Sequence, residues 1–366
     1  MSVQIALICE SKAYTFSAQL LFEKVAGIPL LLRNILLLKK IGVKSLGVVL
    51  PNPLVAIFEA EVAPELKKRG IEVALLSYDG TLAADQVQAQ VKIPAQALVD
   101  PNLPSPFYHV LIDEPSKIKE AEKLLLEKIR LSTPGPIARH LNKRISLPIS
   151  LRLARWGFHP NWITLVNMVL GVASGVVVAE GTYNAFILGG FMFQMASVFD
   201  GCDGEVAKLT FTTSKFGQYF DTLSDNGALL SFFAGLFMAY AQLHTATITS
   251  GLAILFAVGL GGLLWQMIQF LKKNTNSASL ATFDKEYLAK LSPETTPHFL
   301  LKLIQIGKTL MRKDCFSLLI FISALFGILP WWLYLATAST WIANGVLLHL
   351  KQLAQNAAYE QENNRI

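Results

Sequence analysis

The chain has 366 residues, enough for two domains, and 52% of them are hydrophobic, with a mean hydropathy of +0.44. This composition excludes an ordinary soluble protein and predicts membrane-spanning segments. The net charge of +6 gathers near the ends of the apolar segments, which favours anionic lipid headgroups as partners and argues against nucleic acid. The three cysteines lie far apart in the chain, so neither a disulfide framework nor a zinc site is expected.

Residues 1–130 are predicted to form a cytoplasmic, soluble α/β domain. Runs typical of strands alternate with runs typical of helices, and this order implies a largely parallel, Rossmann-like sheet. The predicted strands are Val3–Cys9, Ser45–Leu50, Glu72–Leu76 and Tyr108–Ile112, and the predicted helices are Ala26–Ile41, Leu54–Lys68 and Ser116–Ile129. The first apolar run is too short for a signal-peptide core, so we expect the N-terminus to stay in the cytoplasm.

The segment Phe22–Arg33 resembles a stretch of the sugar-phosphate nucleotidyltransferases. Its Lys24 precedes a Gly27-Ile-Pro-Leu-Leu sequence, as in that family. The resemblance implies a glycine-rich phosphate loop ahead of it, but residues 9–17 contain no glycine, and Asp100 is the one suggested acidic metal ligand. We therefore expect a degenerate domain with a structural or regulatory role. A divergent active site that uses Lys24 is the alternative.

Residues 131–158 mix basic and apolar side chains. They are predicted to form an amphipathic juxtamembrane helix on the cytoplasmic side of the bilayer. Arg139 and Arg144 are expected to face phospholipid headgroups, with a phosphate of the acceptor or the donor as the alternative partner.

Residues 159–351 are predicted to form an all-α integral membrane domain of six transmembrane helices, followed by a C-terminal tail, 352–366. The six apolar spans are 161–180, 184–209, 216–242, 247–271, 314–329 and 332–350. Nine basic residues flank the spans on one side: Arg152, Arg155, Lys208, Lys215, Lys272, Lys273, Arg312, Lys313 and Lys351. The turns on the other side carry no Lys or Arg, so the positive-inside rule places both termini in the cytoplasm. Residues Pro297–Met311, in the loop before the fifth span, have a helix-like pattern.

Charge inside the apolar region is confined to one short segment. Seven of the eight charged side chains between Trp156 and Leu271 lie within Asp200–Asp225. The polar link Thr210–Ser214 is short, so the helices before and after it are expected to be antiparallel neighbours.

The aspartates of this segment fall on the facing sides of the two predicted helices. One face carries Asp200, Asp203, Gly204 and Ala207, and the other carries Gly217, Asp221 and Asp225. Counting outward from Thr212 sets Asp203 level with Asp221, and Asp200 level with Asp225.

Four facing carboxylates in apolar surroundings require cations. Each costs about 2–3 kcal/mol in the membrane when ionised, and their mutual repulsion adds to that cost. An all-oxygen site suits Mg²⁺ or Mn²⁺, and four carboxylates hold two ions about 4 Å apart. Gly204, Ala207 and Gly217 leave room for a bulky ligand, and Lys208 is placed to meet a diphosphate.

This segment resembles the signature of the CDP-alcohol phosphotransferase family, Asp-x2-Asp-Gly-x2-Ala-Arg-x8-Gly-x3-Asp-x3-Asp. It matches every position except one, because Lys208 stands where the family usually has Arg. The resemblance covers roughly residues 135–350. The stretch Pro160-Asn161-Trp-Ile-Thr164 also resembles the family's entry to the first span. Asn161 either caps this helix or, like Thr164, contacts the ligand.

The resemblance implies transfer of a phosphate-linked alcohol from a CDP-alcohol donor to an acceptor alcohol, with release of CMP. It implies that Asp200, Asp203, Asp221 and Asp225 hold the Mg²⁺ or Mn²⁺ pair, and that Asp225 is also the general base. The donor would contact Gly204, Ala207, Lys208 and Gly217. The donor is either CDP-diacylglycerol or a CDP-polyol such as CDP-inositol. Dimerisation is common in the family, so a homodimer is expected. We expect the protein in a cytoplasmic membrane of bacterial or archaeal type.

Two other functions stay open at this point. Some family members fuse a cytidylyltransferase domain to the membrane domain, so a bifunctional enzyme that also makes its CDP-polyol donor is the first alternative. An ion transporter with a carboxylate site is the second. A transporter would need carboxylates near the middle of the membrane, whereas this segment opens at one end.

Overall fold

The computed structural model describes residues 3–9, 19–79, 89–95, 97–99, 108–273 and 312–363. The glycine-free loop, Asp100 and the segment Pro297–Met311 lie outside these ranges, wholly or nearly so. The chain divides into two compact units, Met1–Ile163 with Asp200–Gln218, and Thr164–Phe199 with Tyr219–Ile366. The boundaries between the units, at 163/164, 199/200 and 218/219, each fall within a helix.

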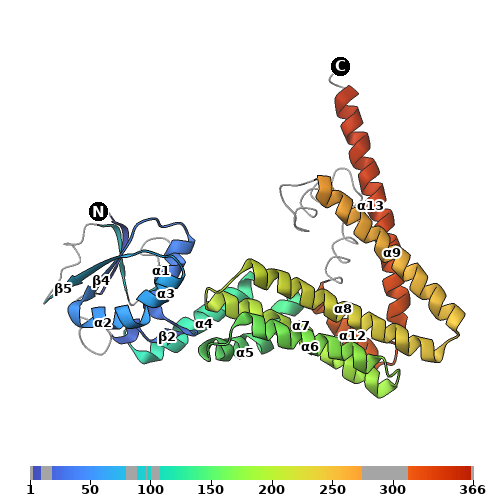
Figure 1. The fold of residues 1–366 in the computed structure, drawn as a ribbon, viewed down its shortest axis with the longest axis horizontal. Coiled ribbons are helices and arrows are strands. Elements are labelled where there is room, and N and C mark those ends of the chain that lie inside the picture. The colour runs from blue at the N-terminus through green and yellow to red at the C-terminus, as the bar shows by residue number, and fades with distance from the viewer. Residues whose placement is uncertain are drawn as a thin grey trace. The chain divides into compact units, whose positions relative to one another are not determined.

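A four-stranded parallel sheet is the centre of the first unit (Figure 1). Its strands lie in the order β5-β4-β1-β6, with bounds β1 (Val3–Ile8), β4 (Leu46–Pro51), β5 (Ala74–Tyr78) and β6 (Ala89–Pro94). β1 pairs with β4 from Ile5 opposite Leu46, and every residue of β4 is buried. The parallel sheet predicted for the N-terminal α/β region is confirmed. β6 was not predicted, because polar Gln90 and Lys92 interrupt its apolar pattern.

The helices of the α/β region differ in extent from those predicted: the first is shorter, the second is divided in two, and the last is longer. They are α1 (Leu30–Lys40), α2 (Asn52–Glu61), α3 (Ala63–Lys68) and α4 (Pro115–Ser132). α1 begins at Leu30 because Ala26 and Gly27 have positive φ angles of 49° and 92°, which close a small hairpin. The break between α2 and α3 comes just before Pro64, which has no backbone N–H to donate.

Two small antiparallel pairs complete the α/β region. The hairpin just described joins β2 (Lys24–Val25) to β3 (Ile28–Pro29), and β7 (Ala97–Val99) pairs with β8 (Tyr108–Leu111). A 3₁₀ turn, Gln19–Leu21, precedes the first pair. The core of the region contains Leu7, Leu32, Val48 and Leu50, all at most 2% exposed.

The segment after α4 is not one continuous helix. A π-helical turn, Ala138–Asn142, leads into α5 (Lys143–Arg155), which contains Pro148. Residues 131–158, predicted as one helix, thus contain the end of α4, the π-helical turn and α5, and their place at the bilayer surface stays a prediction.

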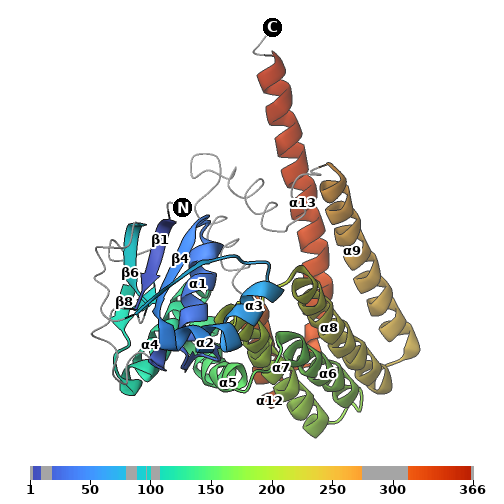
Figure 2. The ribbon, with the colours of Figure 1, turned by 60° about the vertical axis from the view of Figure 1, so that its left-hand side comes forward.

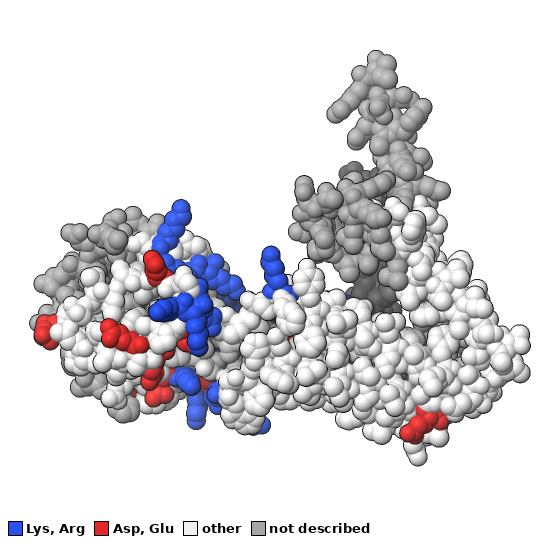
Figure 3. Space-filling model, viewed as in Figure 1, with Lys and Arg blue, Asp and Glu red and all other residues white. Residues whose placement is uncertain are grey.

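The helical part of the chain contains α6 (Pro160–Val178), α7 (Tyr183–Leu209), α8 (Lys215–Leu243), α9 (Ala246–Lys273), α12 (Lys313–Leu325) and α13 (Trp331–Asn363). Among the described residues, four helices are long and apolar enough to cross a membrane, namely α6, α7, α8 and Ala246–Leu263 of α9. The 13 residues of α12 span about 20 Å, less than the roughly 30 Å of a hydrocarbon core. Figure 3 shows charged side chains gathered over the α/β region, and few on the described face of the helical part.

Small residues bring α6 and α8 into backbone contact. A Cβ atom added at Gly175 would lie 2.2 Å from the Ser231 carbonyl oxygen, and one added at Gly235 would lie 1.9 Å from the Gly175 carbonyl oxygen. The Ser231 hydroxyl donates to the Val172 carbonyl at 2.9 Å. Packing through glycine is the usual way for membrane helices to approach closely. α9 and α13 also lie side by side (Figure 2), where Asn344 donates to the Gly259 carbonyl at 2.7 Å.

We expect Gly235→Ala to destabilise the helical unit by about 2 kcal/mol, because the added methyl group overpacks the α6–α8 contact. Thermal unfolding in detergent measures the effect. Gly251→Ala is the matched control, since a Cβ there meets nothing within 4 Å. Equal melting temperatures for the two variants would contradict the proposed close contact.

Candidate functional site

The turn between α7 and α8 is built by local hydrogen bonds. α7 ends at Leu209, and the backbone N–H of Thr212 donates to the Ala207 carbonyl at 3.0 Å. The Ser214 hydroxyl accepts the backbone N–H of Gly217 at 2.9 Å and so caps the start of α8. Phe211 has a positive φ of 54°, which reverses the chain direction within a few residues. The predicted helix–turn–helix around Thr210–Ser214 is therefore present.

Three aspartates of this hairpin come together. One carboxylate oxygen from each of Asp200, Asp221 and Asp225 lies within 4.8 Å of the others, and all three residues are half-buried. Asp221 and Asp225 are one helical turn apart on α8, and Asp200 comes from α7. Three half-buried carboxylates at this spacing repel one another, and they form an all-oxygen donor set that fits a hard divalent cation.

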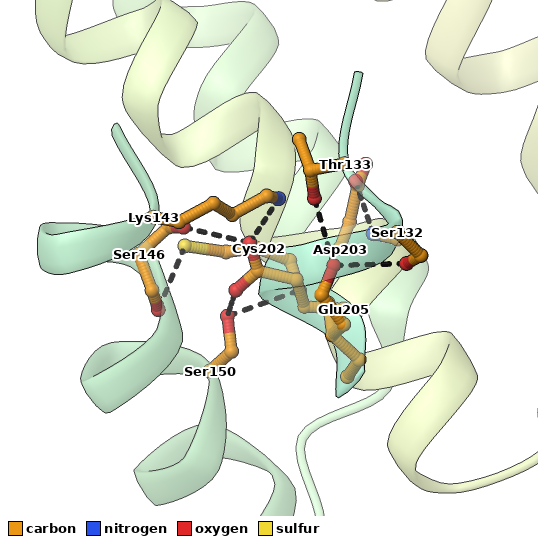
Figure 4. Close-up of polar contacts among 10 residues, drawn as sticks. Ser132, Thr133, Lys143, Ser146, Ser150, Cys202, Asp203 and Glu205 are labelled. Carbon is orange, nitrogen blue, oxygen red and sulfur yellow. Dashed lines mark hydrogen bonds and ion pairs between the residues drawn. The ribbon is translucent and has the colours of Figure 1, made fainter. Parts of the chain in front are cut away.

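Asp203 lies outside this group of three. It is 6% exposed, and its Oδ1 accepts the backbone N–H of Gly204 at 2.5 Å. Figure 4 shows its side chain turned toward Ser132 and Thr133 at the end of α4. A step of three residues turns a helix by about 300°, so Asp203 is displaced by roughly 60° around α7 from Asp200.

The residues predicted to contact the donor have different surroundings. Gly204 is exposed, and a Cβ atom there would meet nothing within 4 Å. Lys208, one helical turn further along α7, is also exposed. Ala207 is 8% exposed, and a Cβ at Gly217 would lie 3.1 Å from the Ser214 hydroxyl and 3.4 Å from the Asn161 amide oxygen. The open face of α7 is thus formed by Gly204 and Lys208.

The remaining predicted residues lie in three places. The Arg139 guanidinium donates to the Thr133 carbonyl at 3.0 and 3.1 Å, whereas Arg144 and Lys24 are exposed. Asn161 is half-buried in the first turn of α6, where its backbone N–H donates to Nδ1 of His159 at 3.2 Å. Thr164 is 2% exposed.

A buried carboxylate that the sequence analysis missed ties α7 to α5. Glu205 is 2% exposed, forms an ion pair with Lys143, and accepts hydrogen bonds from Ser146 at 2.7 Å and Ser150 at 2.6 Å (Figure 4). These three partners occupy positions i, i+3 and i+7, which form one face of α5. That polar stripe on an amphipathic helix was the feature of the sequence from which a buried polar partner could have been predicted.

A second missed residue contacts one of the three aspartates. Lys313, at the start of α12, forms an ion pair with Asp225. The sequence analysis used Lys313 only as an indicator of membrane orientation. Ser317, one helical turn further along α12, donates to the Gln194 side chain of α7 at 2.7 Å.

A sequence model of the CDP-alcohol phosphatidyltransferase family matches residues 158–341, which is half of the chain and includes every aspartate of the hairpin. The chain belongs to this family. The membership confirms the resemblance that the hairpin motif carries.

The chain is also similar to individual proteins of known name. It is 35% identical over 134 residues to a bifunctional IPC transferase and DIPP synthase of Thermococcus kodakarensis, covering 36% of this chain and 29% of that protein. A protein of the same name from Aquifex aeolicus is 34% identical, over 37% of this chain and 30% of that protein. A CDP-diacylglycerol–serine O-phosphatidyltransferase of Helicobacter pylori is 33% identical over 26% of this chain and 41% of that protein. The matched part thus spans less than half of the length of each relative.

We expect Lys143→Met to destabilise the protein by about 3 kcal/mol, because it leaves the Glu205 carboxylate buried without its cation. Denaturant unfolding in detergent measures this loss. Arg144→Met is the matched control, since Arg144 is exposed and its replacement should cost less than about 0.5 kcal/mol. Adding Glu205→Gln to Lys143→Met should restore part of the loss, and no restoration would contradict the buried ion pair.

Proposed function

We propose that this protein is a membrane-embedded, metal-dependent CDP-alcohol phosphotransferase. It moves a substituted phosphate from a CDP-linked donor to an acceptor alcohol and releases CMP. The observation that supports this most directly is the group formed by Asp200, Asp221 and Asp225 within the part of the chain that matches the family.

The metal site consists of the four motif aspartates. Asp200, Asp221 and Asp225 would hold Mg²⁺ or Mn²⁺. Asp203, whose side chain lies outside that group in this structure, would be the fourth ligand, for a second ion. When bound, the metal neutralises charge on the donor diphosphate and on the departing CMP. The carboxylate donors suit these hard ions and disfavour metals that prefer sulfur or imidazole.

The other residues of the hairpin bind and orient the donor. The exposed positions Gly204 and Lys208 give the diphosphate an open face of α7 with one positive charge. Lysine at this position supplies charge without the two parallel hydrogen bonds of an arginine. Ala207 and Gly217 keep side-chain bulk away from the nucleotide.

Asp225 acts as the general base. Its carboxylate takes the proton of the acceptor hydroxyl, and the alcohol oxygen forms a bond to the phosphorus that carries the donor's alcohol group. The bond from that phosphorus to the bridging oxygen then breaks, and CMP leaves with that oxygen. Lys313 orients the Asp225 carboxylate through their ion pair.

The donor that we favour is a CDP-polyol, with a polyol phosphate as the acceptor. Four relatives named bifunctional IPC transferase and DIPP synthase support this choice. CDP-diacylglycerol is the second candidate, because two other relatives are named for that lipid donor. A bifunctional protein whose residues 1–130 also make the donor remains the alternative for the Rossmann-like region.

The enzyme has six transmembrane helices, with both termini in the cytoplasm, and it works as a homodimer. In this arrangement α12 together with the residues up to Leu329 supplies the fifth span, and α13 supplies the sixth. The basic residues at one end of the spans keep the aspartate hairpin on the side where CDP-linked donors and divalent metals are found.

We expect the protein in detergent with Mn²⁺ to release CMP from CDP-inositol when a polyol phosphate is supplied. Asp225→Asn should reduce this release by at least about 100-fold while retaining donor binding, because the base is lost and the residues assigned to the donor are unchanged. Asn226→Ala is the matched control, since Asn226 is exposed and its side chain donates to the Thr222 carbonyl of its own helix. Unchanged turnover in Asp225→Asn would overturn the assignment of the base.

The choice of donor is tested in the same assay. Release from CDP-diacylglycerol instead of CDP-inositol would make the protein a phospholipid synthase. Diphosphate release from CTP and a polyol phosphate, lost in Lys24→Met, would support the bifunctional alternative. No CMP release from any donor would contradict the proposed function.

A further inference from the structure

The turn of the aspartate hairpin is inserted into the α/β region. Phe211 packs against the apolar core that contains Leu32, Leu36 and Val48. Its φ of 54° is unfavourable for a bulky residue, so the conformation persists only where the surroundings determine it. Those surroundings come from the first unit of the chain, to which the turn itself belongs.

Arg33 of α1 holds the last carbonyl of α7. Its guanidinium is 3% exposed and donates to the Leu209 carbonyl at 2.6 Å. The same side chain donates to the Val25 carbonyl at 2.8 and 3.2 Å and to the Ala26 carbonyl at 3.4 Å. The final carbonyls of a helix have no partner within the helix, and a cation there is favoured by the helix dipole. Arg33 therefore supplies both the donor and the charge that the end of α7 requires.

Two more basic residues contact the same turn. The Arg69 guanidinium donates to the Phe211 carbonyl at 2.7 Å. The Arg33 guanidinium carbon lies 5.6 Å from the centre of the Phe211 ring, and the Lys40 ammonium lies 6.0 Å from it. Both distances are within the range of a cation–π interaction. The ring and the carbonyl of one turn residue thus meet cations from α1 and from the end of α3.

The β2–β3 hairpin, whose sequence resembles that of a nucleotidyltransferase, also packs against α5 and α4. A Cβ atom at Gly27 would lie 2.2 Å from the Ala154 carbonyl oxygen of α5. The backbone N–H of Ala26 donates to Glu122 at 3.0 Å, and Glu122 forms an ion pair with Arg155 of α5. The positive φ of Gly27 thus serves a contact with α5.

Burial lowers the pKa of Arg33 to about 10, and the nearby charge of Glu122 opposes this shift. The guanidinium therefore stays protonated at neutral pH, so the contact with the Leu209 carbonyl is charge-assisted.

We propose that the α/β region acts as a clamp on the aspartate hairpin, with Arg33 and Phe211 as positioning residues for its metal site. The proposal rests on the phosphotransferase function given above. Asp203 is six residues before Leu209, which is about 9 Å along the helix. An end of α7 that is free to rotate or fray would therefore misplace the aspartates. A domain outside the membrane thereby sets the metal affinity of the catalytic helices.

The test measures Mn²⁺ binding to the full chain in detergent, in the absence of any CDP-linked donor. The electron paramagnetic resonance signal of the free ion reports how much Mn²⁺ remains unbound. Arg33→Met and Phe211→Gly should each weaken Mn²⁺ binding by about tenfold or more, as changes behind metal ligands do. Glycine accepts the positive φ of residue 211, so Phe211→Gly removes the ring without adding backbone strain. Phe211→Leu keeps an apolar side chain and should retain most of the affinity.

Asn34→Ala is the matched control. Asn34 follows Arg33 on α1, is fully buried, and hydrogen-bonds Ala95, Ala97 and Val99 within the α/β region. Its replacement should lower the melting temperature but leave Mn²⁺ affinity within about twofold, because the pairing with Leu209 and Phe211 remains. In CMP release, excess Mn²⁺ should restore part of the activity of Arg33→Met and none of that of Asp225→Asn.

Folded Arg33→Met and Phe211→Gly proteins that bind Mn²⁺ like the unmodified chain would overturn the clamp. Equal losses of Mn²⁺ affinity in Asn34→Ala and Arg33→Met would overturn it as well, because they would show a general effect of stability. If the unmodified chain binds Mn²⁺ but releases no CMP from any donor, the proposed function fails. Weaker Mn²⁺ binding in Arg33→Met would still support the clamp in that case.

Discussion

Carboxylates placed among apolar helices must be compensated, and the rest of this structure depends on how that is done. Glu205 is satisfied within the protein, by Lys143 and two serine hydroxyls, so it is a structural link between α5 and α7. Asp200, Asp221 and Asp225 converge instead on one another, with Lys313 beside one of them. Mutual convergence of like charges raises their free energy, and a divalent cation lowers it. The same constraint thus distinguishes the Glu205 packing contact from the candidate metal site.

Arg33 and Phe211 connect the α/β region to the turn of the aspartate hairpin: Arg33 donates to the Leu209 carbonyl, and Phe211 packs against the core of the α/β region. A helix end near a candidate metal site gains from a fixed terminus, because small displacements of reacting groups are costly in rate. In this chain the side chains of Arg33 and Lys40, which contact the end of α7 and the turn after it, come from α1, which precedes α7 by more than 140 residues. The α/β region therefore supports the hairpin through these contacts.

The sequence was sufficient to predict the features of the fold that depend on local periodicity. Alternating strand and helix patterns predicted the parallel sheet, and the i, i+4 spacing of Asp221 and Asp225 placed them on one face. The start of α1 was missed because two adjacent residues with positive φ have no periodic signature. The Glu205–Lys143 pair and the Lys313–Asp225 pair join residues 62 and 88 positions apart, and the Arg33–Leu209 bond joins residues 176 apart. Contacts of that range follow from the packing of whole elements, which one sequence does not encode as a pattern.

The central claim is that aspartates of two helices act as a single metal-dependent unit. The most direct measurement is a double-mutant cycle on CMP release, with Asp200→Asn, Asp221→Asn and the double variant at saturating Mn²⁺. Groups that act as one unit are strongly non-additive. The account predicts that the double variant is no slower than the slower single variant, within about threefold. Rate losses that multiply in the double variant would contradict a shared site and would leave the two helices with independent roles.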